Sequence, residues 1–156
     1  MDASKQKGKS LDILRIMEMI PHRYPFLLID RLEDVIANES AVGIKNVTMN
    51  EYYFQGHFPG RPVVPGVIII EAMAQTAAVL VVETLGPEAE GKLVYFMTIN
   101  DARFRKLVGP GDTLHVHVRK LYNRRNIWKF RGEARVDGNL MAEATFAAMI
   151  VDELAP

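Results

Sequence analysis

The chain contains no cysteine among its 156 residues. This absence excludes disulfide bonds, thiolate metal ligands and a cysteine nucleophile, and it is compatible with a reducing cytoplasm. No apolar segment closely follows the polar residues 1–9, so we expect no secretory signal and a cytoplasmic location. We expect residues 1–9 to be frayed and residues 10–156 to form one globular domain, since 49% of the residues are hydrophobic.

Metal and nucleic-acid sites have little support in the sequence. The chain has only four histidines. His115 and His117 share one face of a predicted strand, but no carboxylate accompanies them locally, so we predict no metal site. There is one tryptophan and no RNA- or DNA-binding motif, so we predict no nucleic-acid partner.

Residues 102–131 contain nine basic residues and one acidic residue. They could attract an acidic partner or simply form solvated strand faces.

The sequence has one long hydrophobic run, from Val67 to Leu85. Glu71, Gln75 and Glu83 interrupt it, and charged groups are costly at membrane depth, so we predict no membrane partner. Apolar residues occur on all sides of a helix built from this run, which indicates a helix enclosed by its own protein. We expect the helix to begin near Pro65 or Gly66 and to end at Gly86-Pro87.

Strand patterns flank this helix on both sides. A shorter helix capped by Ser10 is predicted to run to Ile20 and to stop at Pro21. Asp137-Gly138 predicts a tight hairpin turn, because both residues tolerate positive φ. The predicted strands cover residues 26–37, 40–48, 92–104, 113–119, 127–136 and 140–151. One buried helix with a strand meander predicts an α+β domain.

His57 lies on a loop rich in proline and glycine, Gly56 to Gly66. Its unperturbed pKa, near neutral pH, suits a general acid or base. A single histidine is more often structural, but a loop so restricted in its backbone often holds a side chain in place.

Glu71 lies among isoleucine, alanine and methionine neighbours in the apolar helix. Burial disfavours a charged carboxylate, so we predict a raised pKa and a carboxyl group able to donate a proton. Gln75, one turn later, could instead satisfy Glu71, or both could orient a hydroxyl group or water. The free N–H groups at the helix start near Gly66 could stabilise developing negative charge. Base, acid and anion site together fit removal of an α proton with loss of a β hydroxyl.

Two linked motifs resemble a known family. His57-Phe58-Pro59-Gly60-x-Pro62-x-x-Pro65-Gly66 and Glu71-Ala72-Met73-Ala74-Gln75 resemble the signature of the FabZ-type (3R)-3-hydroxyacyl-[acyl-carrier-protein] dehydratases. Residues 21–31, 102–106 and 110–112 resemble the same family, so the likeness covers residues 11–151. The combined pattern is far more specific than any single piece.

The resemblance implies a hot-dog fold, an antiparallel sheet wrapped around a long central helix. It implies dehydration of (3R)-3-hydroxyacyl-carrier protein to the trans-2-enoyl product in type II fatty acid biosynthesis, without a cofactor. It further implies homodimers, often trimers of dimers, with the acyl tunnel at the dimer interface. His57 would come from one subunit and Glu71 from the other, while the Gly66 N–H holds the thioester carbonyl.

The same resemblance suggests supporting residues. Phe58, Val64, Pro65 and Gln75 would line the tunnel or orient the substrate, and Val64 stands where methionine is common, so chain-length preference stays open. The acidic acyl carrier protein, with its phosphopantetheine-linked chain, would dock on basic residues, for which the candidates are Arg103, Arg105, Lys106, Lys129 and Arg131.

Four alternatives remain open on sequence grounds. The isomerising dehydratase, the R-specific enoyl hydratase and the hot-dog thioesterase share the fold, and the fourth is an acyl-binding module without activity. The first carries Asp where this chain has Glu71, and the second uses another Asp–His arrangement. A binding module would need neither His57 nor Glu71.

Overall fold

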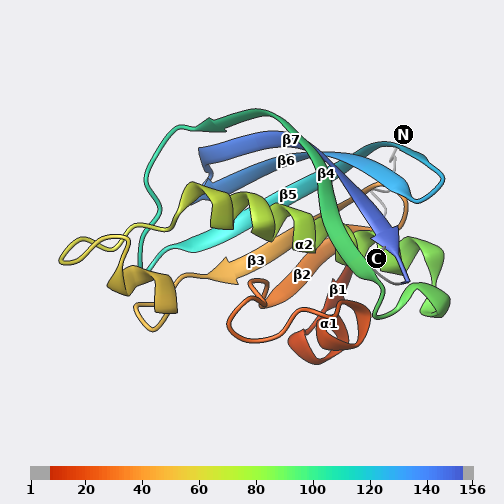
Figure 1. Ribbon diagram of the computed structural model, residues 1–156, viewed down its shortest axis with the longest axis horizontal. Coiled ribbons are helices and arrows are strands. Elements are labelled where there is room, and N and C mark those ends of the chain that lie inside the picture. The colour runs from red at the N-terminus through yellow and green to blue at the C-terminus, as the bar shows by residue number, and fades with distance from the viewer. Residues whose placement is uncertain (1–7, 153–156) are drawn as a thin grey trace, which may run out of the picture.

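The central run of apolar residues forms helix α2 (Gly66–Leu85). A computed structural model describes residues 8–152, and α2 runs through its middle (Figure 1). Fourteen of its residues are buried, on every side of the helix, as the sequence predicted. The helix is long and apolar enough to cross a membrane by length and composition, but 72% of that apolar window is buried within the protein itself. It is therefore the core helix of the fold.

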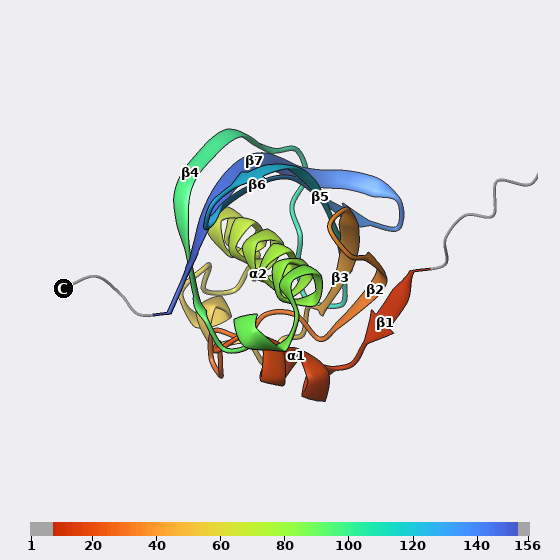
Figure 2. The same cartoon turned by 90° about the vertical axis from the view of Figure 1, so that its right-hand side faces the viewer.

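One antiparallel sheet of seven strands curves around α2, in the order β1-β2-β3-β5-β6-β7-β4 (Figures 1 and 2). Viewed along the helix, the strands form an arc, and helix α1 (Ile13–Met19) lies on the side that the sheet leaves open (Figure 2). The strands are β1 (Lys9–Leu11), β2 (Arg31–Ile36), β3 (Ser40–Asn46), β4 (Leu93–Phe104), β5 (Thr113–Arg124), β6 (Ile127–Val136) and β7 (Asn139–Val151). This arrangement confirms the predicted hot-dog fold.

The inner face of the sheet packs directly on the helix. Every second residue of β6 is buried, as alternation in a strand requires. Two glycines let the backbones come close: a Cβ at Gly43 would clash with the side chain of Thr76, and one at Gly132 would lie 2.7 Å from Met73 Sδ. The alanines and glycines of helix and sheet thus bring α2 into the curve of the strands.

Strand β4 forms the far edge of the sheet, after the chain has crossed over from the end of α2 (Figure 2). It pairs with β7 on one side only. Several large apolar side chains of β4 are exposed: Tyr95, Met97, Ile99 and Phe104. An exposed, apolar strand edge of this length is a surface that proteins normally cover.

The structure confirms the predicted hairpin turn and the predicted ends of the long helix, both of which depend on the residues at those positions. Asp137 and Gly138 both have positive φ, 49° and 80°, as the hairpin prediction required. Helix α2 begins at Gly66 after the N-cap Pro65 and ends at Leu85, followed by the C-cap Gly86, whose φ is 97°.

Three sequence predictions need correction. Ser10 does not cap α1, because it lies in β1; Asp12 is the cap, and its side chain accepts from the Arg15 N–H at 2.9 Å. The strand predicted from residue 26 begins only at Arg31, because the backbone before it turns and is bound by side chains of α2. The strand predicted over 113–119 continues to Arg124. Of the segment predicted to be frayed, residues 1–7 lie outside the described residues, and Lys9 begins β1.

Candidate active site

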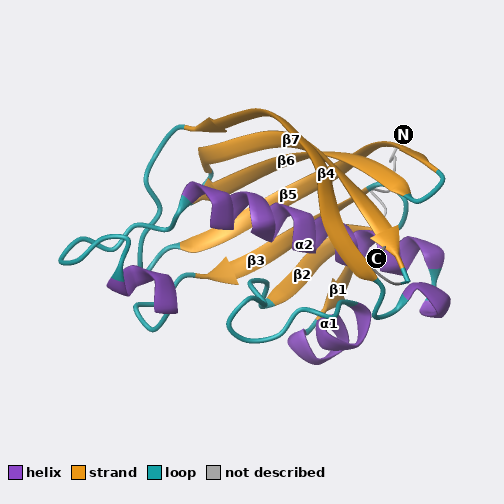
Figure 3. Ribbon diagram, viewed as in Figure 1, coloured by secondary structure: helices purple, strands orange, loops and turns teal. Residues whose placement is uncertain are grey.

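A backbone network fixes the loop that carries His57. The loop follows the short 3-10 helix η1 (Tyr52–Gln55), and the His57 N–H donates to the Tyr53 carbonyl at 2.9 Å. The Val63 N–H donates to the His57 carbonyl at 3.0 Å, and Phe58 and Arg61 exchange two backbone hydrogen bonds. Figure 3 shows this segment as a long irregular connection between β3 and α2. These backbone hydrogen bonds, together with the prolines, therefore hold the loop in one conformation.

The geometry of the His57 ring selects its tautomer. Nδ1 lies 2.7 Å from the carbonyl oxygen of Val63. A carbonyl only accepts, so the proton of neutral His57 lies on Nδ1, and Nε2 carries the free lone pair. The ring also stacks on Phe58, with centroids 4.0 Å apart. His57 is thus held by Nδ1, which leaves the Nε2 lone pair free to accept a proton.

A buried polar cluster anchors η1 in turn. Glu51 accepts from Lys45 Nζ at 2.5 Å, from the Tyr53 hydroxyl at 2.7 Å and from the Thr48 N–H at 3.1 Å. Lys45 is only 4% exposed. Burial, followed by the hydrogen bond to Glu51, raises the pKa of Tyr53 far above its usual value, so its hydroxyl remains a donor. Sequence analysis missed this cluster, since nothing in the spacing predicted that Lys45 would be buried.

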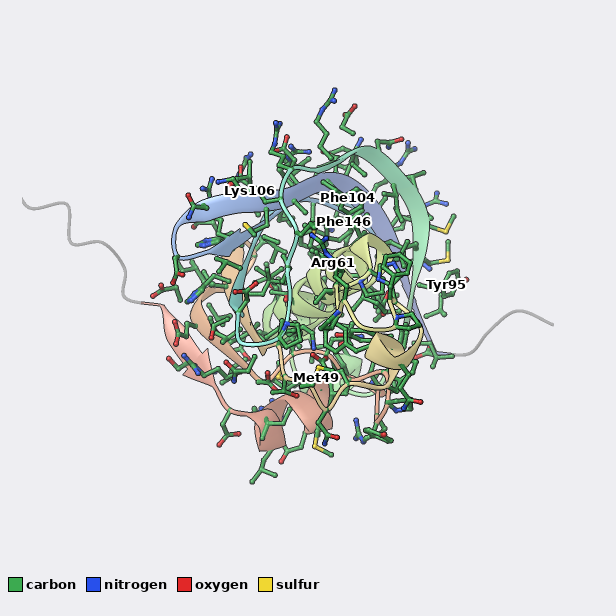
Figure 4. The ribbon with its side chains drawn as sticks, turned by 90° about the vertical axis from the view of Figure 1, so that its left-hand side faces the viewer. Met49, Arg61, Tyr95, Phe104, Lys106 and Phe146 are labelled. Atoms are coloured by element: carbon green, nitrogen blue, oxygen red, sulfur yellow. The ribbon has the colours of Figure 1, made fainter. Side chains whose placement is uncertain are left out.

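An apolar groove of about 500 Å³ opens beside His57. Figure 4 views this end of the molecule and labels Arg61, Phe104 and Lys106, three of the residues that line it. The lining residues are His57, Phe58, Arg61, Val63, Val64, Gly66, Val67, Ile69, Phe104, Lys106, Leu107 and Val108. The walls are hydrocarbon, with two basic side chains and one histidine, which suits an apolar chain attached to an anionic group.

The start of α2 opens into the same groove. Pro65 is its N-cap, and no side chain caps the helix. The Gly66 N–H is one of the first-turn donors that have no acceptor within a helix. A Cβ at Gly66 would lie 2.6 Å from the Phe104 ring, so only glycine fits here without displacing that ring. A backbone donor, the positive end of the helix dipole and His57 therefore share one groove.

Glu71 lies on another side of the helix, paired with Gln75. Gln75 is 1% exposed; its amide donates to Glu71 Oε1 at 3.2 Å and to the Phe26 carbonyl at 2.8 Å, and its oxygen accepts from the Leu28 N–H at 2.9 Å. Burial raises the pKa of Glu71, and the Gln75 hydrogen bond opposes that shift only in part. This is the direction predicted from the apolar neighbours in the sequence.

Glu71 does not line the groove that contains His57 in the described part of the chain. The groove beside His57 is lined by Gly66, Phe58 and Val64, but not by Glu71 or Gln75. The sequence candidates therefore divide into two groups. His57, Phe58, Val64 and Gly66 surround the groove, with Pro65 at its helix cap, whereas Glu71 and Gln75 form a separate pair.

Two residues with no predicted role lie close to these groups. Arg61 lines the groove of His57. His22 lies in the connection after α1, with Nε2 3.7 Å from Glu71 Oε1. Both residues fall inside the segments that resemble the dehydratase family, which was the only signal that could have found them.

The five basic residues proposed for docking have different environments. Arg105 and Arg131 both form ion pairs with Glu143, at 3.3 and 2.8 Å, and lower its pKa, Arg105 most strongly through its hydrogen bonds. Lys129 Nζ lies over the Tyr122 ring, 5.5 Å from its centroid. Arg103 is exposed on β4. Of the five, only Lys106 lines the groove.

Potential metal ligands do not gather in the described part of the chain. Residues 8–152 contain no group of three or more histidine, aspartate or glutamate side chains that could hold an ion. His117 lies on the outer face of β5 in a surface depression that Asp34 and Glu133 also line, and its pKa is lowered, mainly by burial.

Comparisons with known proteins agree with one another. A FabA-like domain matches residues 20–145. The chain is 70% identical over 152 residues to the 3-hydroxyacyl-[acyl-carrier-protein] dehydratase FabZ of Paramagnetospirillum magneticum, covering 97% of this chain and 94% of the relative. It is 65% identical over 156 residues to the protein of the same name from Rhodospirillum rubrum, covering 98% of each.

Among solved structures, the dehydratase heterocomplex ApeI:P from Xenorhabdus doucetiae has a similar fold. The TM-score is 0.76 at 18% sequence identity, covering 88% of this chain and 91% of the other. At this identity the likeness supports the fold alone.

Proposed function

Because the chain belongs to the FabZ family of 3-hydroxyacyl-[acyl-carrier-protein] dehydratases, we propose that it removes water from a (3R)-3-hydroxyacyl group on acyl carrier protein, in type II fatty acid biosynthesis. The product is the trans-2-enoyl thioester. The observation that carries the proposal to particular residues is the groove that both His57 and the start of α2 line, with the Nδ1 atom of His57 bound to a backbone carbonyl.

His57 serves as the general base. Its Nδ1–H is held by the Val63 carbonyl, which leaves Nε2 to take the α proton of the substrate. The same carbonyl stabilises the imidazolium that forms, because it accepts a hydrogen bond from the charged ring. The electrons of the broken C–H bond form the new double bond between the α and β carbons.

The Gly66 N–H binds the thioester carbonyl. It lies at the positive end of α2, in an apolar groove, where a fixed donor stabilises developing enolate charge. Phe104 packs where a Cβ of residue 66 would lie and so places the acyl thioester against the backbone.

Glu71 serves as the general acid. Its raised pKa favours the protonated form, and the protonated carboxyl gives its proton to the leaving hydroxyl, which departs as water. Gln75 then stabilises the carboxylate by donating to Oε1. His57 then releases its proton to solvent and Glu71 takes one up from solvent, so both residues end the cycle in their starting protonation states.

A homodimer would bring the two halves together. Within one chain Glu71 lies outside the groove of His57, and the apolar edge strand β4 is exposed. Pairing of β4 with β4 of a second copy would cover that edge and could place Glu71 of one subunit beside His57 of the other. We further propose assembly into a homohexamer, a trimer of dimers, from the family resemblance, and a cytoplasmic location from the absence of cysteine and of a predicted secretory signal.

Lys106 and Arg61 are the basic residues best placed to receive the acyl carrier protein. Both line the groove, and a phosphopantetheine arm that enters it carries a phosphate at the end closest to the carrier. Arg105 and Arg131 already pair with Glu143, so they contribute less. Arg103 and Lys129 would support docking from the nearby strands.

The test follows enoyl-thioester formation from (3R)-3-hydroxyacyl-carrier protein, in the wild type and in His57→Ala and Glu71→Gln. We expect a loss of about a hundredfold or more in each variant, because each removes one proton-transfer group. Circular dichroism and sedimentation would establish that both variants stay folded and assembled. A wild type that forms no enoyl product but releases free thiol would instead be a thioesterase.

A further inference from the structure

Among residues 8–152, His22 is the one histidine whose side chain lies beside the proposed general acid. It lies between α1 and β2, with a side chain 13% exposed, and Nε2 is 3.7 Å from Glu71 Oε1. A depression formed by Pro21, His22, Leu93, Val94 and Tyr95 lies beside it. Sequence spacing could not show this contact, because 49 positions separate the two residues.

The other ring nitrogen of His22 has no partner. Nδ1 is buried, and no group among residues 8–152 lies within hydrogen-bonding distance of it. Burial and the nearby Arg23 guanidinium both lower the pKa of His22, so the ring is neutral and carries a single proton. A buried N–H group without an acceptor costs more free energy than a buried nitrogen lone pair without a donor. The proton therefore lies on Nε2, which faces Glu71.

We propose that His22 is a positioning residue for Glu71, whose neutral Nε2–H supplies a second hydrogen-bond donor, beside Gln75, to the same carboxyl oxygen. The inference rests on the proposed function and adds to it. Catalytic hydrogen bonds are often long without substrate and tighten when it binds, so the 3.7 Å separation suits a bond made in the working complex.

Two donors on Oε1 leave Oε2 of Glu71 to face the substrate. Oε2 carries the acidic proton and transfers it to the leaving hydroxyl, so that one water molecule and one carboxylate form. The carboxylate is stabilised because both donors bind it more strongly than they bind the neutral acid. His22 itself neither gains nor loses a proton in this step, and in this it differs from His57.

Within residues 8–152, few other titratable or charged groups face the pair. On α2, Gln75 is neutral. From the connection after α1, Arg23 is fixed by donating to the Met17, Ile20 and His22 carbonyls. From β4, Tyr95 donates its hydroxyl to Met149 Sδ. The acidity of Glu71 therefore depends mainly on burial and on the hydrogen bond from Gln75, and the proposed donor on His22 adds to the effect of Gln75.

The first test compares His22→Phe with His22→Gln. Phenylalanine keeps a flat ring but removes the donor, so we expect kcat to fall about ten- to a hundredfold, with KM nearly unchanged. The alkaline limb of the kcat profile should also move to higher pH, because Glu71 loses a donor that favours its ionised form. The glutamine amide can reach the position of Nε2 and should restore most of kcat and the profile. His117→Phe changes a histidine on β5, outside the site, and should leave both unchanged.

The second test is imidazole ¹⁵N NMR of histidine-labelled protein, with His22→Gln used to assign the signal. We expect Nε2 protonated and Nδ1 unprotonated from pH 6 to 8. A proton on Nδ1, or a His22→Phe enzyme with the wild-type kcat profile, would overturn the role of His22 while leaving the dehydratase intact. Loss of the proposed function itself would appear differently, as a wild type without dehydration.

Discussion

His57 and Glu71 are held in contrasting ways. The His57 ring is fixed by a backbone carbonyl only six residues away, within one closed loop. Glu71 is surrounded by side chains, Gln75 from its own helix and His22 from a segment 49 residues earlier. A general base that must point one lone pair at carbon gains from a rigid loop. A general acid whose pKa must be tuned gains from burial and adjustable donors.

The strongest way to test this contrast is to separate the two residues onto different chains. His57→Ala and Glu71→Gln proteins are unfolded together, refolded and assayed as a mixture. If the site is shared between subunits, half of randomly mixed dimers are mixed, and each has one intact site. We therefore expect about a quarter of wild-type activity from two nearly inactive proteins.

The control refolds each variant alone. A mixture no more active than the sum of the two would show that His57 and Glu71 act within one chain. The β4 edge would then have to be covered in some other way.

Gly66→Ala tests the groove that contains His57. In Gly66→Ala the new Cβ would lie 2.6 Å from the Phe104 ring, so either the ring or the start of α2 must shift. We expect kcat/KM to fall about a hundredfold, because a displacement near 1 Å at a thioester-binding donor has that effect. Phe104→Ala in the same chain should recover part of the loss.

Gly109→Ala is the matched control for this variant. A Cβ there meets only the Pro62 carbonyl, at 3.4 Å. We expect it to stay near wild-type activity. Equal losses at Gly66 and Gly109 would show that the loops respond to any added methyl group, and not to contact with Phe104.

The anchor of the His57 loop is the next target. Glu51→Gln leaves the Lys45 ammonium group, only 4% exposed, without a charged partner. We expect the free energy of unfolding to fall by about 3 kcal/mol, as it does when a buried ion pair loses one member. Chemical denaturation at fixed protein concentration measures this.

The double variant Lys45→Met/Glu51→Leu removes both charges and should recover a large part of that stability. If Glu51→Gln and the wild type unfold at the same denaturant concentration, the cluster does not anchor the loop.

The sequence predicted features that depend on neighbouring residues better than features that depend on distant partners. The boundaries of α2, the Asp137-Gly138 turn and the base, acid and glycine candidates all lie in stretches where neighbours along the chain decide the conformation. The misplaced cap at Ser10 failed because a strand pairing of β1 with β2 overrode a local capping preference.

The missed residues were missed for a similar reason. Lys45, Glu51 and His22 matter because of partners that the folded sheet and helix bring to them. Isolated lysine, glutamate and histidine residues carry no such signal in a sequence, where the usual expectation is exposure.

The anchor of the Glu71 side is Gln75. Gln75→Leu keeps the size of the side chain but leaves the Phe26 carbonyl and the buried Leu28 N–H without their partners. We expect a loss of about 2 kcal/mol in unfolding free energy, together with a lower kcat, since Glu71 loses a donor. Gln55→Leu, an exposed glutamine in η1, should change neither. A stable Gln75→Leu protein would mean that the segment before β2 is held by packing alone.

The smallest effect expected is a pH dependence of stability that arises from Glu71. Its pKa is raised above the ordinary 4.5, chiefly by burial, so the folded protein keeps this proton at pH values where the unfolded chain has released it. The contribution of Glu71 to stability is therefore full below the ordinary pKa and is lost as pH rises through the raised value. Glu71→Gln has no such proton to lose, so its thermal midpoint should gain on the wild type between pH 4 and pH 8. Both midpoints must be measured at one protein concentration, because assembly also shifts them. A difference in midpoint that stayed constant with pH would mean that Glu71 titrates normally. In that case hydrogen bonds, and not burial, would set the acidity of Glu71.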